Sequence, residues 1–216
     1  SDMSRFWMRQ DLVVPHLVDY LTQRCGVRER DITIVIANGT HTGGDEAELR
    51  TLVTDAVYDR ITVENHNCES EDLVYLGTTP HGTPVSINRT AALADMVICL
   101  GAATHHVMAG FGGGRKSILP GISGRETIFH NHAFSLDATS LRSNPAVGNG
   151  ILQGNPLHED MCEAAGLVKN LFMVNLVMNT QMRLAAIFSG HYLTSWEQAC
   201  RTVNRIYQVD VPRKAD

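Results

Sequence analysis

Residues 32–44 read Ile-Thr-Ile-Val-Ile-Ala-Asn-Gly-Thr-His-Thr-Gly-Gly. The first six, residues 32–37, form a run rich in β-branched side chains, which is typical of a strand covered on both faces. The next seven, residues 38–44, are polar and rich in glycine and predict a loop. The same order recurs at 96–100, an apolar run that leads into a glycine-rich stretch. Because ligands bind beyond the carboxyl ends of strands in an open α/β sheet, both loops are candidate binding segments.

Apolar periodicity predicts further elements on both sides of these two strands. Helices are expected at residues 11–24, 46–59, 90–93, 124–134, 157–167 and 193–207. Additional strands are expected at residues 61–66, 71–76, 84–88, 170–177 and 184–188. Asp45 is placed to cap the second helix and Gly26 to end the first, while the polar segment 138–156 predicts an ordered loop. Helices between apolar strands indicate an α/β fold, in which a single domain has a mainly parallel sheet flanked by helices.

The composition limits the class of protein. A chain of 216 residues that is 44% hydrophobic and 19% charged is neither disordered nor fibrous. A formal net charge of −5 and an aromatic content of 6% argue against a nucleic-acid partner. No apolar run is long enough to span a bilayer and no signal peptide is visible, so we expect a cytoplasmic protein without a membrane partner. Five cysteines without a CxxC motif argue against a zinc ribbon, whereas ten histidines are unusually many.

The segment from Thr104 to Gly121 is the richest in chemically useful side chains. Its triple glycine, residues 112–114, lets the backbone approach a ligand closely, and Arg115 and Lys116 add positive charge, as in a phosphate cradle. A P-loop needs glycine directly before Lys-Ser, and the Rossmann fingerprint needs glycine where Arg115 stands, so neither motif is present. A glycine-rich turn without a ligand remains an alternative. In a desolvated pocket the pKa of Lys116 would fall and favour covalent amine chemistry, although a phosphate-binding or surface lysine is the simpler interpretation.

Four of the ten histidines lie between residues 105 and 132. His105 and His106 are adjacent and cannot point the same way, and His130 and His132 would lie about 200° apart on a helix. One histidine from each pair can therefore reach a common site, which is too few for the usual zinc sites. His41 lies in the other candidate loop, so two histidines from two loops would suit paired acid–base work near neutral pH. A solvated or structural histidine remains the simpler interpretation of each one alone.

The glycine-rich segment and its flanks resemble the nickel-dependent lactate racemase family. The resemblance rests on Gly-Gly-Gly-Arg-Lys-Ser-Ile-Leu-Pro-Gly at residues 112–121, followed by Glu-Thr-Ile at 126–128 and by His132. Supporting matches are Ala-Asn-Gly-Thr-His at 37–41, His106, Asn-Pro-Leu-His-Glu-Asp-Met at 155–161 and Asp-Met-Ser-Arg at 2–5. The resemblance extends over nearly the whole chain. At residue 6 the family has proline where this chain has phenylalanine.

The resemblance implies a cofactor, the nickel-pincer nucleotide, which is a pyridinium mononucleotide that binds nickel through sulfur and carbon atoms. Lys116 would hold it covalently through a thioamide, and His132 would be the one protein ligand to nickel. A single imidazole is enough in this family because the cofactor supplies the other ligands. The residues expected close to the nucleotide are Gly112, Gly113, Gly114, Arg115 and Ser117.

The resemblance also implies the catalytic groups. His41 and His106 would be the paired acid–base residues, one on each face of the substrate. Arg5 would bind the substrate carboxylate, with Asp2 in a supporting role. In the implied mechanism a histidine deprotonates the hydroxyl group, hydride moves to the cofactor, and the planar 2-oxo acid rotates before hydride returns to its other face.

Members of this family are longer and carry a C-terminal domain that closes over the substrate. Residues 1–216 are therefore expected to form the N-terminal domain of a two-domain enzyme, with that C-terminal domain as a partner and with no activity alone. The expected function is racemisation or epimerisation of a small 2-hydroxy acid, lactate or a related compound. Two alternatives remain: a non-catalytic or divergent module that binds an anionic nucleotide or sugar acid, and a conventional metal-dependent hydrolase. The hydrolase would need further ligands near His132, and no carboxylates are suitably spaced.

Overall fold

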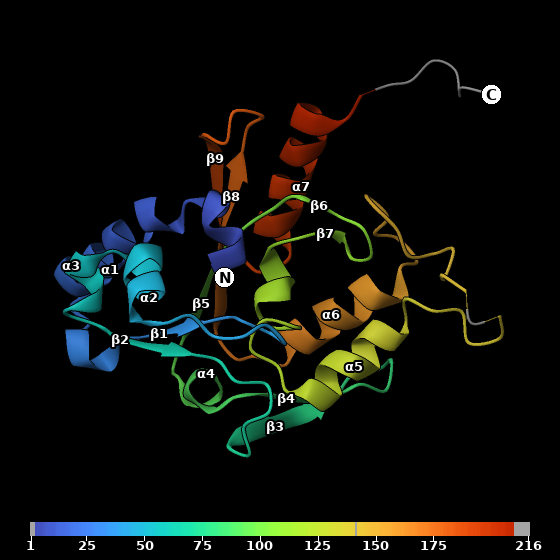
Figure 1. Cartoon of the computed structure of the whole chain (residues 1–216), viewed down its shortest axis with the longest axis horizontal. Helices are drawn as coiled ribbons and strands as arrows, with labels where there is room; N and C mark the ends of the chain where they lie inside the picture. Colours follow the sequence, from blue (N-terminus) through green and yellow to red (C-terminus); the bar gives the residue numbers. More distant parts are fainter. Residues whose placement is uncertain (1–2, 141, 210–216) are drawn as a thin grey trace.

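The computed structural model describes residues 3–140 and 142–209, in which helices and strands alternate (Figure 1). The α-helices are α1 (Val14–Gln23), α2 (Glu46–Val53), α3 (Asp55–Tyr58), α4 (Arg89–Leu93), α5 (Arg125–Ala133), α6 (Pro156–Gly166) and α7 (Thr194–Tyr207). The strands are β1 (Thr33–Ile36), β2 (Thr62–Asn65), β3 (Leu73–Thr78), β4 (Pro84–Asn88), β5 (Val97–Ala102), β6 (His105–His106), β7 (Gly110–Phe111), β8 (Leu171–Met178) and β9 (Leu184–His191). Short 3₁₀ helices are η1 (Met3–Met8), η2 (Gln10–Leu12), η3 (Glu29–Asp31) and η4 (Gly114–Ser117).

The first unit of the fold is the parallel pair of β1 and β2, in which Ile36 is the register partner of Asn65. Helices α1, α2 and α3 lie beside this pair (Figure 1). Their shared apolar core contains Val14, Val18, Ile36, Leu49, Leu52, Val53, Val57 and Ile61. At the start of α2, the Asp45 side chain accepts a hydrogen bond from Glu48 N at 2.9 Å, and Glu48 accepts one from Asp45 N at 3.1 Å. This reciprocal cap fixes where α2 begins after the loop that carries His41.

The second unit is the antiparallel pair of β3 and β4, which packs with α4, α5 and α6. Its core includes Ile118 and Leu119, which directly follow the Lys116–Ser117 dipeptide. Helix α6 begins at Pro156, and the side chain of Asn155 caps it by accepting from His158 N at 3.2 Å. The glycine-rich segment is therefore anchored on its carboxyl side by apolar packing.

The third unit is a sheet in the order β5-β8-β9, with β5 and β8 parallel and β9 antiparallel to β8. Helix α7 packs against β8 and β9 (Figure 1) and buries Trp196 on one face of the sheet. Met8, close to the N-terminus, packs with Val174 and Leu176 on a further core of the same sheet. The sheet thus lies between α7 and the first residues of the chain.

The candidate loops meet where these units join. Gly39 N, just beyond β1, donates to Gly121 O at 2.9 Å, and Gly121 N donates to Lys116 O at 3.0 Å. The loop after β1 therefore lies against the segment that follows β5, as expected for loops at the carboxyl ends of strands.

The α/β class is confirmed, although the sheets are mixed rather than purely parallel. Among the described residues the strands form four small sheets, of which β1–β2 and β5–β8 are parallel pairings. All the helices and strands expected from periodicity are present, with boundaries that shift by one to a few residues. The Asp45 cap is confirmed, and Gly26 adopts a φ of 72° while Val27 N donates to Leu21 O, which ends α1 as predicted.

Two features differ from the expectation. The helix predicted at 46–59 is divided into α2 and α3, because Thr54 between them has a φ of 76°, which interrupts the helical backbone. The glycine-rich segment contains an antiparallel hairpin, β6–β7, and the η4 turn, where no element was predicted. No helix in the described residues is long and apolar enough to cross a membrane.

Candidate active site

Lys116 is the centre of the candidate site. It lies in η4, and its Nζ is 3.4 Å from Nε2 of His106. Burial, together with the positive charges of Arg115 and Arg5, lowers the pKa of Lys116 to about 7. Near neutral pH a large share of this amine is therefore uncharged and able to act as a nucleophile.

His106 points from β6 toward Lys116. Its Nδ1 accepts hydrogen bonds from Met108 N at 3.2 Å and Ala109 N at 3.1 Å, so in the neutral ring the proton is on Nε2. The Nε2–H then donates to the uncharged Lys116 amine. Burial lowers the pKa of His106 to about 4, and the charges of Lys116 and Arg5 act in the same direction. The ring is accordingly neutral at physiological pH.

His132 approaches the same lysine from α5. Its Nδ1 donates to Ile128 O at 2.9 Å, which leaves the Nε2 lone pair available. Burial lowers the pKa of His132, and the charge of Lys116 contributes to the same shift. A neutral imidazole with Nδ1–H bonded to a backbone carbonyl is the usual form of a metal-ligating histidine. His132 thus has the tautomer needed to bind a metal through Nε2.

Arg5, on η1, completes this basic group. Its side chain is half-buried, and its charge acts on both His106 and Lys116. The N-terminal segment therefore contributes a guanidinium group to a site otherwise built after β5. Asp2, the supporting residue expected from the sequence, lies outside the described residues.

His41 lies in the loop between β1 and α2 and is exposed. Its backbone N–H donates to Asn38 O at 3.0 Å, which closes a turn at the start of the loop. Through Gly39 and Gly121 this loop touches the segment that follows Lys116. The structure thus brings the His41 loop to the edge of the site.

Arg115 is fully buried, and its side chain contacts other groups of the protein. Its guanidinium donates to Ala109 O at 2.6 Å and Phe111 O at 2.7 Å, and it stacks 3.9 Å from the Trp196 ring. Nε donates to Nδ1 of His158 at 3.1 Å. Burial lowers the pKa of Arg115 to about 10. These contacts hold the β6–β7 hairpin in place, so contact with a nucleotide stays a prediction for Arg115.

The other residues predicted to lie near a nucleotide also have close neighbours within the protein. A Cβ on Gly113, where φ is 68°, would lie 2.6 Å from Ala102 O, and one on Gly114, where φ is 55°, would lie 2.4 Å from Trp196 Cδ1. The Trp196 indole donates to Gly112 O at 2.9 Å. The triple glycine is thus required by packing, whether or not it also approaches a ligand. A Cβ on Gly101 would lie 3.6 Å from Oγ of Ser117, so this hydroxyl faces β5.

The structure places one histidine of each pair near Lys116 and directs the other elsewhere. His105 points away from Lys116, packs on Phe111 and pairs through Nε2 with Asn204 Oδ1 at 2.9 Å. His130 pairs through Nδ1 with Thr83 Oγ1 at 2.9 Å. The remaining members, His106 and His132, are those whose pKa is influenced by Lys116.

The sequence analysis did not predict that His158 and Trp196 contact Arg115 and so support the site. Their rings lie 5.4 Å apart, centroid to centroid. His158 follows Asn155-Pro156, so the helix start was visible in the sequence, but its partner Arg115 was not.

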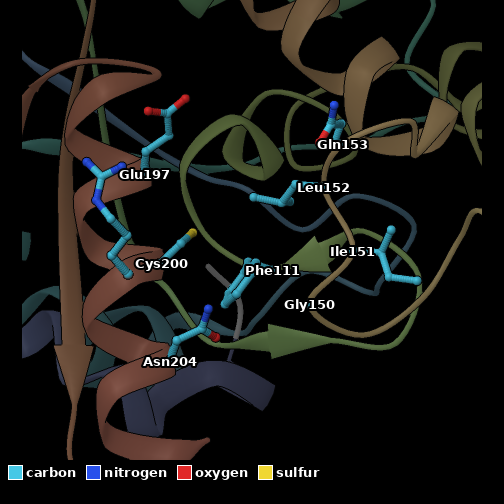
Figure 2. A pocket seen from close by; sticks show the side chains of 9 residues that line it. Phe111, Gly150, Ile151, Leu152, Gln153, Glu197, Cys200 and Asn204 are labelled. Atoms are coloured by element: carbon cyan, nitrogen blue, oxygen red, sulfur yellow. The ribbon is translucent and has the colours of Figure 1, made fainter.

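A cavity of about 480 Å³ lies between α7 and the 150–153 loop, with Phe111 on its wall (Figure 2). It borders Phe111 and Asn204, the partners of His105, and so lies apart from the His106 side of the hairpin.

A second cluster of potential metal ligands lies elsewhere. Within the described parts of the chain, the His/Cys/Asp/Glu group close enough to share a metal is His81, Asp160 and Glu163. The buried Asp160 carboxylate already accepts hydrogen bonds from Thr79, Thr83 and Asn131. His132 is not in this group.

Comparison of the sequence with known proteins identifies its family. Residues 1–143 match the model of the lactate racemase N-terminal domain. A lactate racemase from Thermoanaerobacterium thermosaccharolyticum is 32% identical over 200 residues, which cover 92% of this chain and 45% of the relative. One from Lactiplantibacillus plantarum is 31% identical over 179 residues, covering 82% and 41%. The chain thus spans less than half the length of these relatives.

Comparison with solved structures gives a result consistent with the sequence matches. The lactate racemase apoprotein from T. thermosaccharolyticum superposes with a TM-score of 0.87 at 30% identity, over 95% of this chain and 48% of that one. A protein from Thermotoga maritima shares the fold, with a TM-score of 0.73 at 21% identity over 91% and 51% of the two chains. The chain therefore belongs to the lactate racemase family, whose N-terminal domain model its residues 1–143 match.

Proposed function

We propose that this chain is the cofactor-binding and acid–base domain of a racemase or epimerase that acts on a small 2-hydroxy acid, lactate or a related compound. The observation that carries the proposal is the convergence of Arg5, His106 and His132 on Lys116. These side chains are basic, so the ligand that suits them carries carboxylate or phosphate groups. The reaction is taken from the names of the two curated relatives.

The residues suit the two-faced chemistry of racemisation, which needs a proton-exchanging group on each side of the reacting carbon. His106 stays neutral at physiological pH and presents its Nε2–H to the site, so in this tautomer it can donate a proton there. We assign His41 to the opposite face, because its loop touches the segment that follows Lys116. Arg5 binds the substrate carboxylate, which orients the hydroxyl-bearing carbon between the two imidazoles.

The site also fits a nickel-pincer nucleotide joined to Lys116. The lysine amine is uncharged to a large extent near pH 7, as formation of a thioamide requires. His132 keeps an Nε2 lone pair for one bond to nickel. When bound, this group would supply the hydride acceptor that amino-acid side chains lack. Burial of Lys116 and His106 keeps water away from the position where that exchange would occur.

Chiral chromatography of 2-hydroxy acids tests the proposal. Because the relatives extend beyond this chain, we expect turnover from the holoprotein that includes a C-terminal domain, and none from residues 1–216 alone. His41→Ala and His106→Ala should each lower racemisation by about 10²–10⁴-fold. His105→Gln is the matched control and should leave racemisation unchanged, because His105 faces Asn204.

The opposite result favours the alternative function. If an anionic nucleotide or sugar acid binds and His41→Ala and His106→Ala leave its affinity unchanged, while no 2-hydroxy acid is isomerised, the domain is a binding module. The basic side chains around Lys116 would then serve affinity alone.

A further inference from the structure

Asn65, the last residue of β2, spans the two ends of the loop that carries His41. Its Oδ1 accepts from Asn38 Nδ2 at 3.1 Å, at the start of the loop. The same Oδ1 accepts from Gly44 N at 3.2 Å, and its Nδ2 donates to Gly44 O at 2.8 Å, at the end of the loop. His41 lies midway between Asn38 and Gly44 in the sequence.

The orientation of both amides is fixed by their backbone partners. Gly44 O accepts only and Gly44 N donates only, so the Asn65 amide satisfies both in one orientation. Asn38 Nδ2 also donates to His66 O at 3.2 Å, which again allows one orientation. Asn38 itself is 3% exposed. The start of the loop is therefore held by a buried side chain whose amide cannot turn over without losing both hydrogen bonds.

Close packing strengthens the same connection. A Cβ on Gly43 would lie 2.7 Å from Asn65 Cγ, so the loop backbone rests directly on the asparagine side chain. At the other end, Gly39 N donates to Gly121 O, which links the loop to the Lys116 segment. Between these anchors, Thr40, His41 and Thr42 are exposed. An exposed residue in a short loop keeps a constant position only when both loop ends are fixed.

We infer that Asn65 is a positioning residue that fixes the His41 loop against the Lys116 segment. This role rests on the proposed function, in which His41 serves one face of the substrate. Asn65 acts through the side-chain amide of Asn38 and the backbone of Gly44, and has no contact with the reacting groups in this assignment. Asn65→Ala removes all three hydrogen bonds, whereas Asn65→Asp keeps the shape but removes the donor to Gly44 O.

Hydrogen exchange on the 216-residue chain tests the inference without any turnover. In Asn65→Ala and Asn65→Asp, the amides of residues 39–44 should exchange about tenfold faster, with those of α7 unchanged. The matched control is Asn67→Ala: Asn67 is exposed, lies two residues away and bonds Glu69 N rather than the loop. Unchanged exchange in residues 39–44 of both variants would overturn the inference, as would equal acceleration in β1, β2 and α7.

Kinetics of the holoprotein separate this role from the proposed function. We expect Asn65→Asp to lower kcat of racemisation about tenfold with little change in KM, because positioning of an acid–base group is lost rather than substrate binding. If His41→Ala abolishes turnover and Asn65→Asp leaves it intact, Asn65 does not position His41, and the proposed function stands. If neither variant changes turnover, His41 is not an acid–base group and both the role of Asn65 and that part of the proposed function are wrong.

Discussion

At the scale of single residues, the site is defined by positive charges that disfavour one another. Lys116 is buried near Arg5 and Arg115, and these neighbours help to lower its pKa from 10.5 to about 7. This arrangement destabilises the folded state relative to the unfolded chain, in which water solvates the charged lysine. The buried lysine therefore lowers the free energy of unfolding near neutral pH, where its amine is reactive.

Lys116→Met should stabilise the domain at pH 7. Between about pH 7 and pH 10.5 the unfolded wild type binds more protons at this lysine than the folded one, so its free energy of unfolding rises with pH. Lys116→Met lacks this titrating amine, so its free energy of unfolding should rise less between these pH values. Urea unfolding across this pH range measures both effects, with Lys169→Met, at an exposed lysine, as the control. Parallel curves for wild type and Lys116→Met would contradict the assigned burial of this charge.

His106 and His132 should show opposite tautomers. His106 accepts at Nδ1 from two backbone amides, and His132 donates from Nδ1 to Ile128 O. Long-range ¹H–¹⁵N spectra of the labelled chain at neutral pH should therefore find the proton on Nε2 of His106 and on Nδ1 of His132. Each ring is a control for the other. If both rings have the same tautomer, the hydrogen bonds assigned to one of them are wrong.

At the scale of elements, η4 and α7 depend on each other. Trp196 of α7 packs on Gly114, stacks on Arg115 and donates to Gly112 O. Arg115 in turn holds the carbonyls of the β6–β7 hairpin that carries His106. Helix α7 therefore supports the geometry of the site through Trp196 and Arg115.

Gly114→Ala should be strongly destabilising. Its φ of 55° is strained for alanine, and the new Cβ would lie 2.4 Å from Trp196 Cδ1. We expect a loss of about 2–4 kcal/mol in the free energy of unfolding, from strain and overpacking together. Gly150→Ala is the matched control: φ is 73° and nothing lies within 4 Å of its Cβ, so it measures the backbone strain alone. Equal losses in urea unfolding of the two variants would show that Trp196 does not confine Gly114.

The same elements show what the sequence could predict. Local signals were sufficient for the β-branched strand β1, for the Asp45 cap and for the separation of His105 from His106, because each depends on neighbours along the chain. Features that depend on distant residues could not be read from the sequence. The burial of Arg115 is one of them, because it is decided by Trp196, far along the sequence. The break at Thr54 and the two-residue strands β6 and β7 are too short for periodicity to reveal.

At the scale of the whole molecule, the site lies where separately packed units meet. The β1–β2 unit contributes the His41 loop, the β5-β8-β9 sheet leads into His106 and Lys116, and α5 contributes His132. Each unit has its own apolar core. Motion between the units would change the spacing of the groups that they contribute to the site.

The most direct measurement is the mass of the Lys116 peptide after expression of the protein that includes a C-terminal domain, together with the enzymes that make the nickel-pincer nucleotide. We expect an adduct on Lys116, together with nickel in wild type and a reduced nickel content in His132→Ala. The peptide that contains Lys169 is the internal control and should be unmodified. An unmodified Lys116 in a preparation that racemises a 2-hydroxy acid would contradict the proposed function.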